Sequence, residues 1–108
     1  MLERRQSPWI QKNNRAYYYY RCNANLYNNQ QFDRALSDCN KAIELVPNDP
    51  DALGQRALVN QKMGRKAEAI ADYRQALNYQ LKEDVLESRD SKESQAYRSA
   101  LKELGAKP

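Results

Sequence analysis

Small and apolar residues recur along most of this chain at intervals of three and four residues. The spacing is clearest in segment 32–45, where one helical face would carry Phe32, Ala35, Leu36, Cys39, Ala42 and Ile43. Pro47 and Pro50 lie just beyond this segment, and proline ends helices because it lacks an amide donor. Similar spacing, interrupted at glycine, proline and polar runs, predicts further helices over residues 16–29, 50–63, 65–81 and 91–104. The pattern therefore predicts an all-α protein.

Two of these segments repeat each other at a constant shift along the chain. The shift superposes Ala35 on Ala69, Asp38 on Asp72, Cys39 on Tyr73 and Ala42 on Ala76. Two helices joined by a short turn pack antiparallel at close range, and small side chains permit that approach. The repeat therefore predicts two similar helical hairpins stacked side by side, with alanines at the helix contacts.

The period of this repeat, the paired alanines and the closing Pro47 resemble the tetratricopeptide repeat family. Two segments are close to the typical sequence of that family, namely AIELVPNDPDAL (residues 42–53) and MGRKAEAIADYRQAL (residues 63–77). The resemblance covers about residues 16–81, and it implies a right-handed helical-hairpin solenoid that binds other proteins. This sequence departs from the family pattern at several places. Asn23 stands at a usually small position, Arg56 at a usually apolar one, and Gln30 in place of the first turn glycine.

The two ends of the chain are expected to differ from the repeats. The interpretation assigns residues 1–15 to a basic N-terminal segment or extra helix, 16–49 and 50–81 to the two repeats, and 82–108 to a connector and capping helix. The connector, residues 82–90, is expected to be helical in part. Segment 90–93, which reads DSKE, is typical of an N-terminal capping box. The helix that it opens would cover the free edge of the second repeat. Two repeats are fewer than such folds usually need, so self-association or a longer parent chain stays open.

Composition narrows the classes of function. The chain has no histidine, which is the commonest general base and metal ligand, and it has no glycine-rich phosphate loop. Cys22 and Cys39 without histidine make neither a zinc site nor a Cys–His nucleophile. We therefore expect no enzyme, no cofactor and no metal. The two cysteines are predicted to be buried free thiols, which favours a cytoplasmic location. No apolar run is long enough to span a membrane, so no membrane partner is expected.

Charge gives a mild indication of the partner. The net charge is +4, and segment 1–21 carries this excess. It holds five cations against Glu3, namely Arg4, Arg5, Lys12, Arg15 and Arg21. A basic arm attracts acidic ligands, so the predicted partner is a protein or peptide with a bias towards acidic character.

The tyrosine run 17–20 is the most unusual local feature. Four consecutive helical residues point in different directions, so they cannot share one role. Tyr19 falls on the apolar stripe and is predicted to lie in the core. In the family, another face of each first helix lines a concave peptide-binding groove. The resemblance places on this face Tyr17, Tyr20, Arg21, Tyr27 and Asn28 from the first repeat, and Gln55, Leu58, Gln61 and Lys62 from the second. The alternative is that some of the tyrosines merely pack beneath segment 7–15.

The predicted function is a non-catalytic protein-interaction module, acting as a scaffold, adaptor or assembly factor. A peptide or partner helix would lie in the concave groove, with tyrosines as anchors. One alternative is a self-assembling structural subunit, in which the short solenoid forms homo-oligomers. Single-stranded RNA binding is the least favoured reading, because the second repeat carries only a mild surplus of cations rather than a basic stripe.

Overall fold

The computed structural model describes residues 14–28 and 30–107, and within them the chain forms five helices. They are α1 (Arg15–Tyr27), α2 (Phe32–Leu45), α3 (Pro50–Lys62), α4 (Lys66–Leu86) and α5 (Lys92–Glu103). This part of the chain contains no strand. The predicted all-α class is therefore confirmed. Apart from Asn14 and Arg15, the predicted basic segment 1–15 lies outside the described residues.

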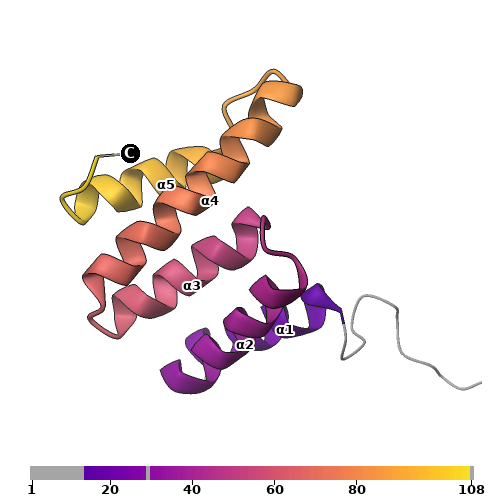
Figure 1. Cartoon of the computed structure of the whole chain (residues 1–108). Coiled ribbons are helices and arrows are strands. Elements are labelled where there is room, and N and C mark those ends of the chain that lie inside the picture. Colours follow the sequence, from indigo (N-terminus) through magenta and orange to yellow (C-terminus); the bar gives the residue numbers. More distant parts are fainter. Residues whose placement is uncertain (1–13, 29, 108) are drawn as a thin grey trace, which may run out of the picture.

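The helices pack in the order in which they follow one another. α1 packs on α2 and α3 on α4 to form two hairpins, α2 contacts α3 between the hairpins, and α5 packs on α4 (Figure 1). This packing of sequence neighbours is that of a helical repeat. None of the helices in the described ranges is long and apolar enough to cross a membrane.

The small side chains predicted at the contacts between helices are buried there. All four alanines of the repeat are fully buried, namely Ala35, Ala42, Ala69 and Ala76. The buried residues form two clusters. The first joins α1, α2 and Val59 of α3, and the second joins α3, α4 and Leu101 of α5. Since α3 contributes to both clusters, it connects the two hairpins into one stack.

The turns inside the two hairpins share one backbone conformation, although they differ in sequence. Gly64, after α3, has a φ of 79°, and Gln30, at the equivalent position of the first hairpin, has a φ of 51°. A side chain in this left-handed region costs roughly 1–2 kcal/mol, a cost from which glycine is free. Gln30 therefore adopts the conformation of the glycine that it replaces.

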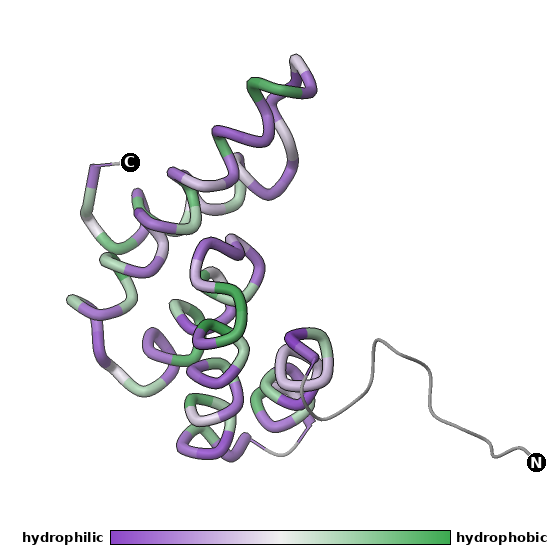
Figure 2. Tube along the Cα trace, turned by 45° about the vertical axis from the view of Figure 1, so that its right-hand side comes forward, coloured by the Kyte–Doolittle hydropathy of each residue, from purple (hydrophilic) through white to green (hydrophobic). Residues whose placement is uncertain are grey.

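The corner between α4 and α5 agrees with the sequence prediction in its connector and differs from it in its cap. The connector 82–90, expected to be helical in part, is helical as far as Leu86, so that α4 continues into it (Figure 1; the end of this helix is the highest point of the trace in Figure 2). The predicted capping box at 90–93 is wrong in its cap residue, because Ser91 Oγ accepts the hydrogen bond from the Ser94 amide at 3.1 Å. Asp90 instead accepts a hydrogen bond from Arg98 at 2.6 Å. The cap moves to Ser91 because a buried carboxylate holds that residue.

That carboxylate belongs to Asp84, which lies in the last turn of α4. It accepts hydrogen bonds from Ser94 Oγ at 2.6 Å, from Ser91 Oγ at 3.0 Å and from the Ser91 amide at 3.1 Å, and its other oxygen accepts one from Gln80 at 3.2 Å. Burial by itself raises the pKa of Asp84, but these hydrogen bonds outweigh it and lower the pKa to about 2. The ionised carboxylate thus holds the start of α5 against the end of α4.

We predict that the corner loses stability in acid because of Asp84. The folded-state pKa lies below the value near 4 of an unfolded aspartate, so the ionised group stabilises the fold above that pH. This contribution is lost as the pH falls from about 4 to about 2. In thermal unfolding followed by circular dichroism, the difference in Tm between the parent protein and Asp84→Asn should shrink by at least half over this range. Glu83→Gln, which changes the exposed neighbour, serves as the control, and parallel curves for Asp84→Asn and the parent would contradict the prediction.

Candidate binding groove

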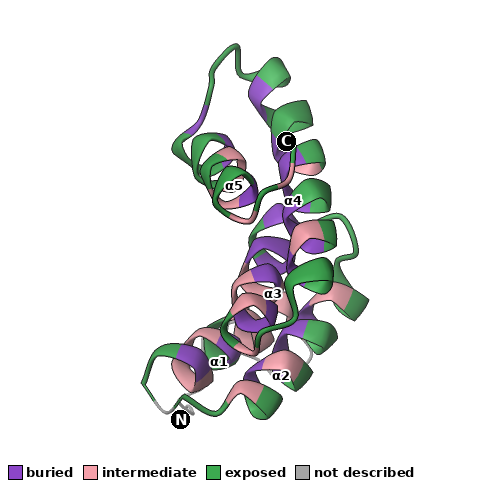
Figure 3. Cartoon of the chain, turned by 90° about the vertical axis from the view of Figure 1, so that its left-hand side faces the viewer, coloured by how far each residue is buried: buried purple, intermediate pink, exposed green. Residues whose placement is uncertain are grey.

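The first helix of each hairpin and the last helix of the chain share one side of the molecule. α1, α3 and α5 lie on this side, and α2 and α4 lie on the other (Figure 3). Side chains from α1, α3 and α5, together with Tyr73 of α4, line an open cavity of about 330 Å³. Its lining consists of Tyr19, Asp51, Gly54, Gln55, Leu58, Tyr73, Glu93, Ala96, Tyr97 and Ala100. We call this cavity, together with the surface that continues from it along α1 and α3, the groove.

Four tyrosines in a row on α1 take different places. Tyr19, expected in the core, is half-buried and lines the cavity, where burial raises the pKa of its hydroxyl. Tyr18 is half-buried beside α2, and Tyr20 is exposed. The run therefore divides its side chains among several surroundings, as the helical geometry predicts.

Tyr17 and Arg21, both expected in the groove, interact with each other. Arg21 Nη1 donates a hydrogen bond to the Tyr17 hydroxyl at 2.9 Å, and the guanidinium lies 5.4 Å from the centre of the Tyr17 ring. Arg21 also pairs with Asp38 of α2 at 3.6 Å. Neither residue lines the cavity between α1, α3 and α5.

The other predicted contact residues divide into three groups. Gln55 and Leu58 line the cavity. Tyr27 and Lys62 lie together at the far end of the groove, where they line a hollow of about 240 Å³ with Leu26, Gln30 and Phe32. Gln61 accepts a hydrogen bond from the Tyr73 hydroxyl at 2.9 Å and so ties α3 to α4, while Asn28 is exposed at the end of α1.

Helix α5, expected from the sequence only to cover the free edge of the second repeat, also forms one wall of the cavity. Tyr97 approaches Gly54 of α3 so closely that a Cβ at Gly54 would lie 2.6 Å from the ring. The Tyr97 hydroxyl donates to the Pro50 carbonyl at 3.1 Å, and burial raises the pKa of this hydroxyl. The spacing of Glu93 and Tyr97, four residues apart on one helical face, was the available signal.

We predict that Gly54→Ala displaces α5 and destabilises the fold. The added methyl group would meet the Tyr97 ring, and overpacking of this kind costs about 1–3 kcal/mol. Urea denaturation should show the loss, and the same substitution in a Tyr97→Leu background should cost less, because the ring is gone. An equal cost in both backgrounds would show that the close contact with Tyr97 is not the cause.

The cavity carries negative charge near the start of α3. Asp51 and Glu93 line it from α3 and α5, and neither forms an ion pair with a residue of the described ranges. Arg15 pairs with Asp49 at 3.0 Å and lies over the Tyr19 ring at 5.3 Å. Burial, followed by the charge of Asp49, raises the pKa of Asp51; Arg15 offsets part of this rise, and Glu93 adds to it. Three carboxylates, those of Asp49, Asp51 and Glu93, thus lie near the single cation Arg15, which pairs with Asp49, so this end of the groove is negative overall.

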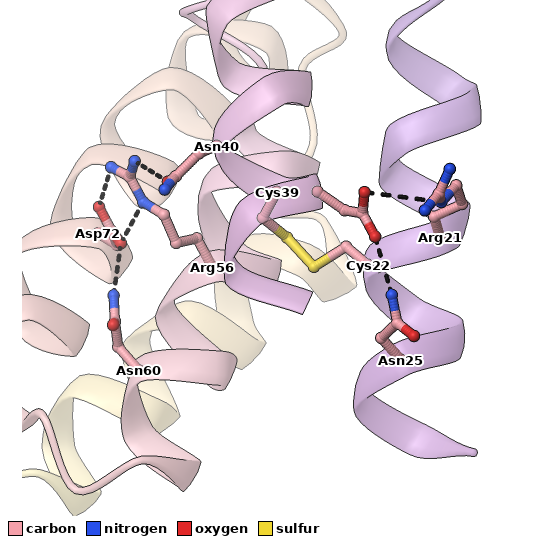
Figure 4. The surroundings of a disulfide bond; sticks show 9 residues. Arg21, Cys22, Asn25, Cys39, Asn40, Arg56, Asn60 and Asp72 are labelled. Carbon is pink, nitrogen blue, oxygen red and sulfur yellow. Dashed lines mark hydrogen bonds and ion pairs between the residues drawn. A yellow bond between two sulfur atoms is a disulfide. The ribbon is translucent and has the colours of Figure 1, made fainter. Parts of the chain in front are cut away.

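The prediction of free thiols is wrong, because Cys22 and Cys39 form a disulfide between α1 and α2 (Figure 4). Their Cα atoms are 5.4 Å apart, within the range that a disulfide bridge needs. Both residues lie on the stripes that face each other across the hairpin, and this was the signal that could have paired them. Because disulfides persist mainly in oxidising compartments, the cysteines no longer support a cytoplasmic location.

The second hairpin has an ion pair where the first has the disulfide. Arg56, which the repeat superposes on Cys22, donates two hydrogen bonds to Asp72 of α4, both at 2.8 Å, and a third to Asn40 of α2 at 3.0 Å (Figure 4). Asn60 also donates to Asp72, at 3.3 Å. The polar residue that departs from the family pattern therefore connects α3 to both of its neighbouring helices.

A tetratricopeptide repeat family model matches residues 39–71, which run from within α2 through α3 into α4. This segment is similar to a tetratricopeptide repeat. A search of the curated proteins finds no match, and a search of the solved structures finds none either.

The matched segment bridges the two hairpins. It contains Cys39, the closing Pro47 and the whole of α3, which supplies residues to both buried clusters. Proteins with this repeat are generally non-catalytic modules of protein–protein interaction, and the resemblance seen in the sequence is thereby confirmed. In the described part of the chain, no three side chains converge as metal ligands.

Proposed function

We propose that this chain is a protein-interaction module, a scaffold or adaptor built from repeats over residues 16–49 and 50–81, which holds a peptide or partner helix in the groove. The observation that carries the proposal is the cavity between α1, α3 and α5, on the side where tetratricopeptide repeats are expected to bind. From the sequence prediction, Gln55, Leu58, Tyr27 and Lys62 line this cavity or the hollow beyond it.

Two features of the groove suit an extended ligand. Tyrosine rings concentrate binding energy at interfaces, and the groove offers Tyr19, Tyr97 and Tyr27 along its length. The Gln55 amide nitrogen is buried and has no hydrogen-bond partner in the described ranges. A buried donor without a partner costs about 1–3 kcal/mol. Gln55 as a whole is half-buried, so a change of its side-chain rotamer would bring this donor to a peptide carbonyl.

The proposal is tested by selecting ligands from a random-peptide library and mapping them by amide chemical shifts on the isotope-labelled protein. We expect the selected peptides to shift the amides of Gln55, Leu58 and Tyr27. Gln55→Ala should weaken binding, whereas Gln75→Ala, which changes an exposed glutamine of α4, should leave it unchanged. Peptides that shift only α2 and α4 would contradict the groove, and binding of single-stranded RNA but of no peptide would favour the RNA alternative.

Self-assembly is the second candidate, because the end of α4 exposes apolar side chains. Val85 is 77% exposed and Leu86 is 86% exposed, and Leu81 lies one turn before Val85. If the chain forms homo-oligomers through this tip, the molar mass from light scattering rises with concentration, and Val85→Asp with Leu86→Asp removes the rise. A mass of one chain at every concentration excludes this candidate.

A further inference from the structure

The net negative charge at one end of the groove, which Arg15 offsets only in part, indicates the chemistry of the partner, and this inference rests on the proposed function. Asp51 enters the cavity from the first turn of α3, and Glu93 enters it from the first turn of α5. Both residues are exposed at the rim and so are accessible to a ligand. The nearby cation Arg15 is already paired with Asp49.

The walls of the cavity suit a long cationic side chain. The faces of tyrosine rings attract cations, and this chain already places the Arg15 guanidinium over Tyr19. Leu58, Tyr97 and Ala96 offer apolar surface beside the carboxylates. Lysine and arginine bury their aliphatic stems along such surface while the charged group reaches polar partners.

We propose that the cavity binds a lysine or arginine side chain of a partner peptide, with its charge between Asp51 and Glu93 and its stem against Leu58 and Tyr97. After a change of its side-chain rotamer, the unpartnered Gln55 amide would donate to a backbone carbonyl of the same peptide. A cation also relieves the repulsion that the charges of Asp49 and Glu93 exert on Asp51 and that contributes to its raised pKa.

This partner is the opposite of the acidic ligand that the charge distribution of the sequence favours. That expectation depended on five cations near the N-terminus. Two of them, Arg15 and Arg21, pair with Asp49 and Asp38. The other three lie outside the described residues, namely Arg4, Arg5 and Lys12. Within the described chain, the cavity is acidic.

The test uses three fluorescent peptides of equal length that alternate alanine with lysine, glutamate or glutamine. Fluorescence anisotropy should rank the lysine peptide first. Asp51→Asn with Glu93→Gln should weaken its binding by about tenfold, the effect of two partly exposed ion pairs. Glu68→Gln with Glu83→Gln is the matched control, because it removes two exposed negative charges from α4 and so changes the net charge by the same amount. Circular dichroism establishes that both variants are folded.

The outcomes separate this inference from the proposed function. Equal losses in both double variants, or a preference for the glutamine or glutamate peptide, overturn the cation site even if amide shifts place the peptide in the groove. If no peptide shifts the amides of Gln55 and Leu58, the groove itself is rejected. If replacing Arg4, Arg5 and Lys12 with serine tightens binding of the lysine peptide, the chain's own segment competes for the cavity, and the assignment to a partner is overturned.

Discussion

Reduction of the Cys22–Cys39 disulfide should lower the free energy of unfolding by about 3 kcal/mol, the loop-closure value for two cysteines with a sequence separation of 17. Both cysteines are fully buried in the cluster that joins α1, α2 and Val59. The bridge restricts the unfolded chain and ties together the two helices of the first hairpin. Since α1 otherwise contacts mainly α2, the loss should be concentrated at this end of the stack.

Guanidinium denaturation with and without reductant measures this effect, and Cys22→Ala with Cys39→Ala provides the control. The double variant should unfold at the midpoint of the reduced protein and should not respond to reductant. Mass spectrometry after alkylation without reductant reports whether the bridge is present. Two alkylated cysteines in the native protein, or one midpoint in both conditions, would contradict the prediction.

Replacement of Arg56 by methionine should cost about 3 kcal/mol, near the lower bound for removing one partner of a buried ion pair. The side chain of Asp72 is only 8% exposed, and without Arg56 its charge retains Asn60 as its remaining polar partner from α3. The side chain of Arg56 is 27% exposed, so water compensates part of the loss. Methionine keeps much of the apolar stem, which isolates the effect of the charge.

A double-mutant cycle tests the assignment. Asp72→Asn alone should also destabilise the protein, but in the Arg56→Met background it should recover part of the stability, because it removes the unpaired charge. Urea denaturation of the four proteins gives the coupling free energy. Strict additivity would show that Arg56 and Asp72 act independently, against the bidentate geometry.

These two experiments address equivalent places in the two hairpins. In the register of the repeat, Cys22 corresponds to Arg56 and Cys39 to Tyr73. Cys22 and Cys39 form a covalent bond, whereas Arg56 pairs with Asp72, the residue next to Tyr73. A single backbone arrangement therefore accommodates a disulfide cysteine and an ion-paired arginine at equivalent positions, while Asp38, the equivalent of Asp72, pairs with Arg21 instead. The two hairpins should accordingly differ in their response, the first to reductant and the second to removal of charge.

The sequence by itself determined the helices, the hairpin repeat and the positions of the small residues at the contacts between helices. Local spacing places the four repeat alanines on the packed faces, because residues three and four apart share a helical face whatever lies opposite. The match over residues 39–71 depends on the same local pattern. For this reason, four of the predicted contact residues also line the groove, namely Tyr27, Gln55, Leu58 and Lys62.

Only the tertiary structure decided which residues meet across helices. It placed Tyr19 in the groove and Tyr17 with Arg21, because contacts with two neighbouring helices set the rotation of α1 about its axis. The disulfide, the Arg56 pair and the corner at Asp84 likewise join residues of different helices or of a helix and a turn. Helical periodicity is a property of one segment, whereas such pairs depend on the distances and angles between segments, and a single sequence does not contain these quantities.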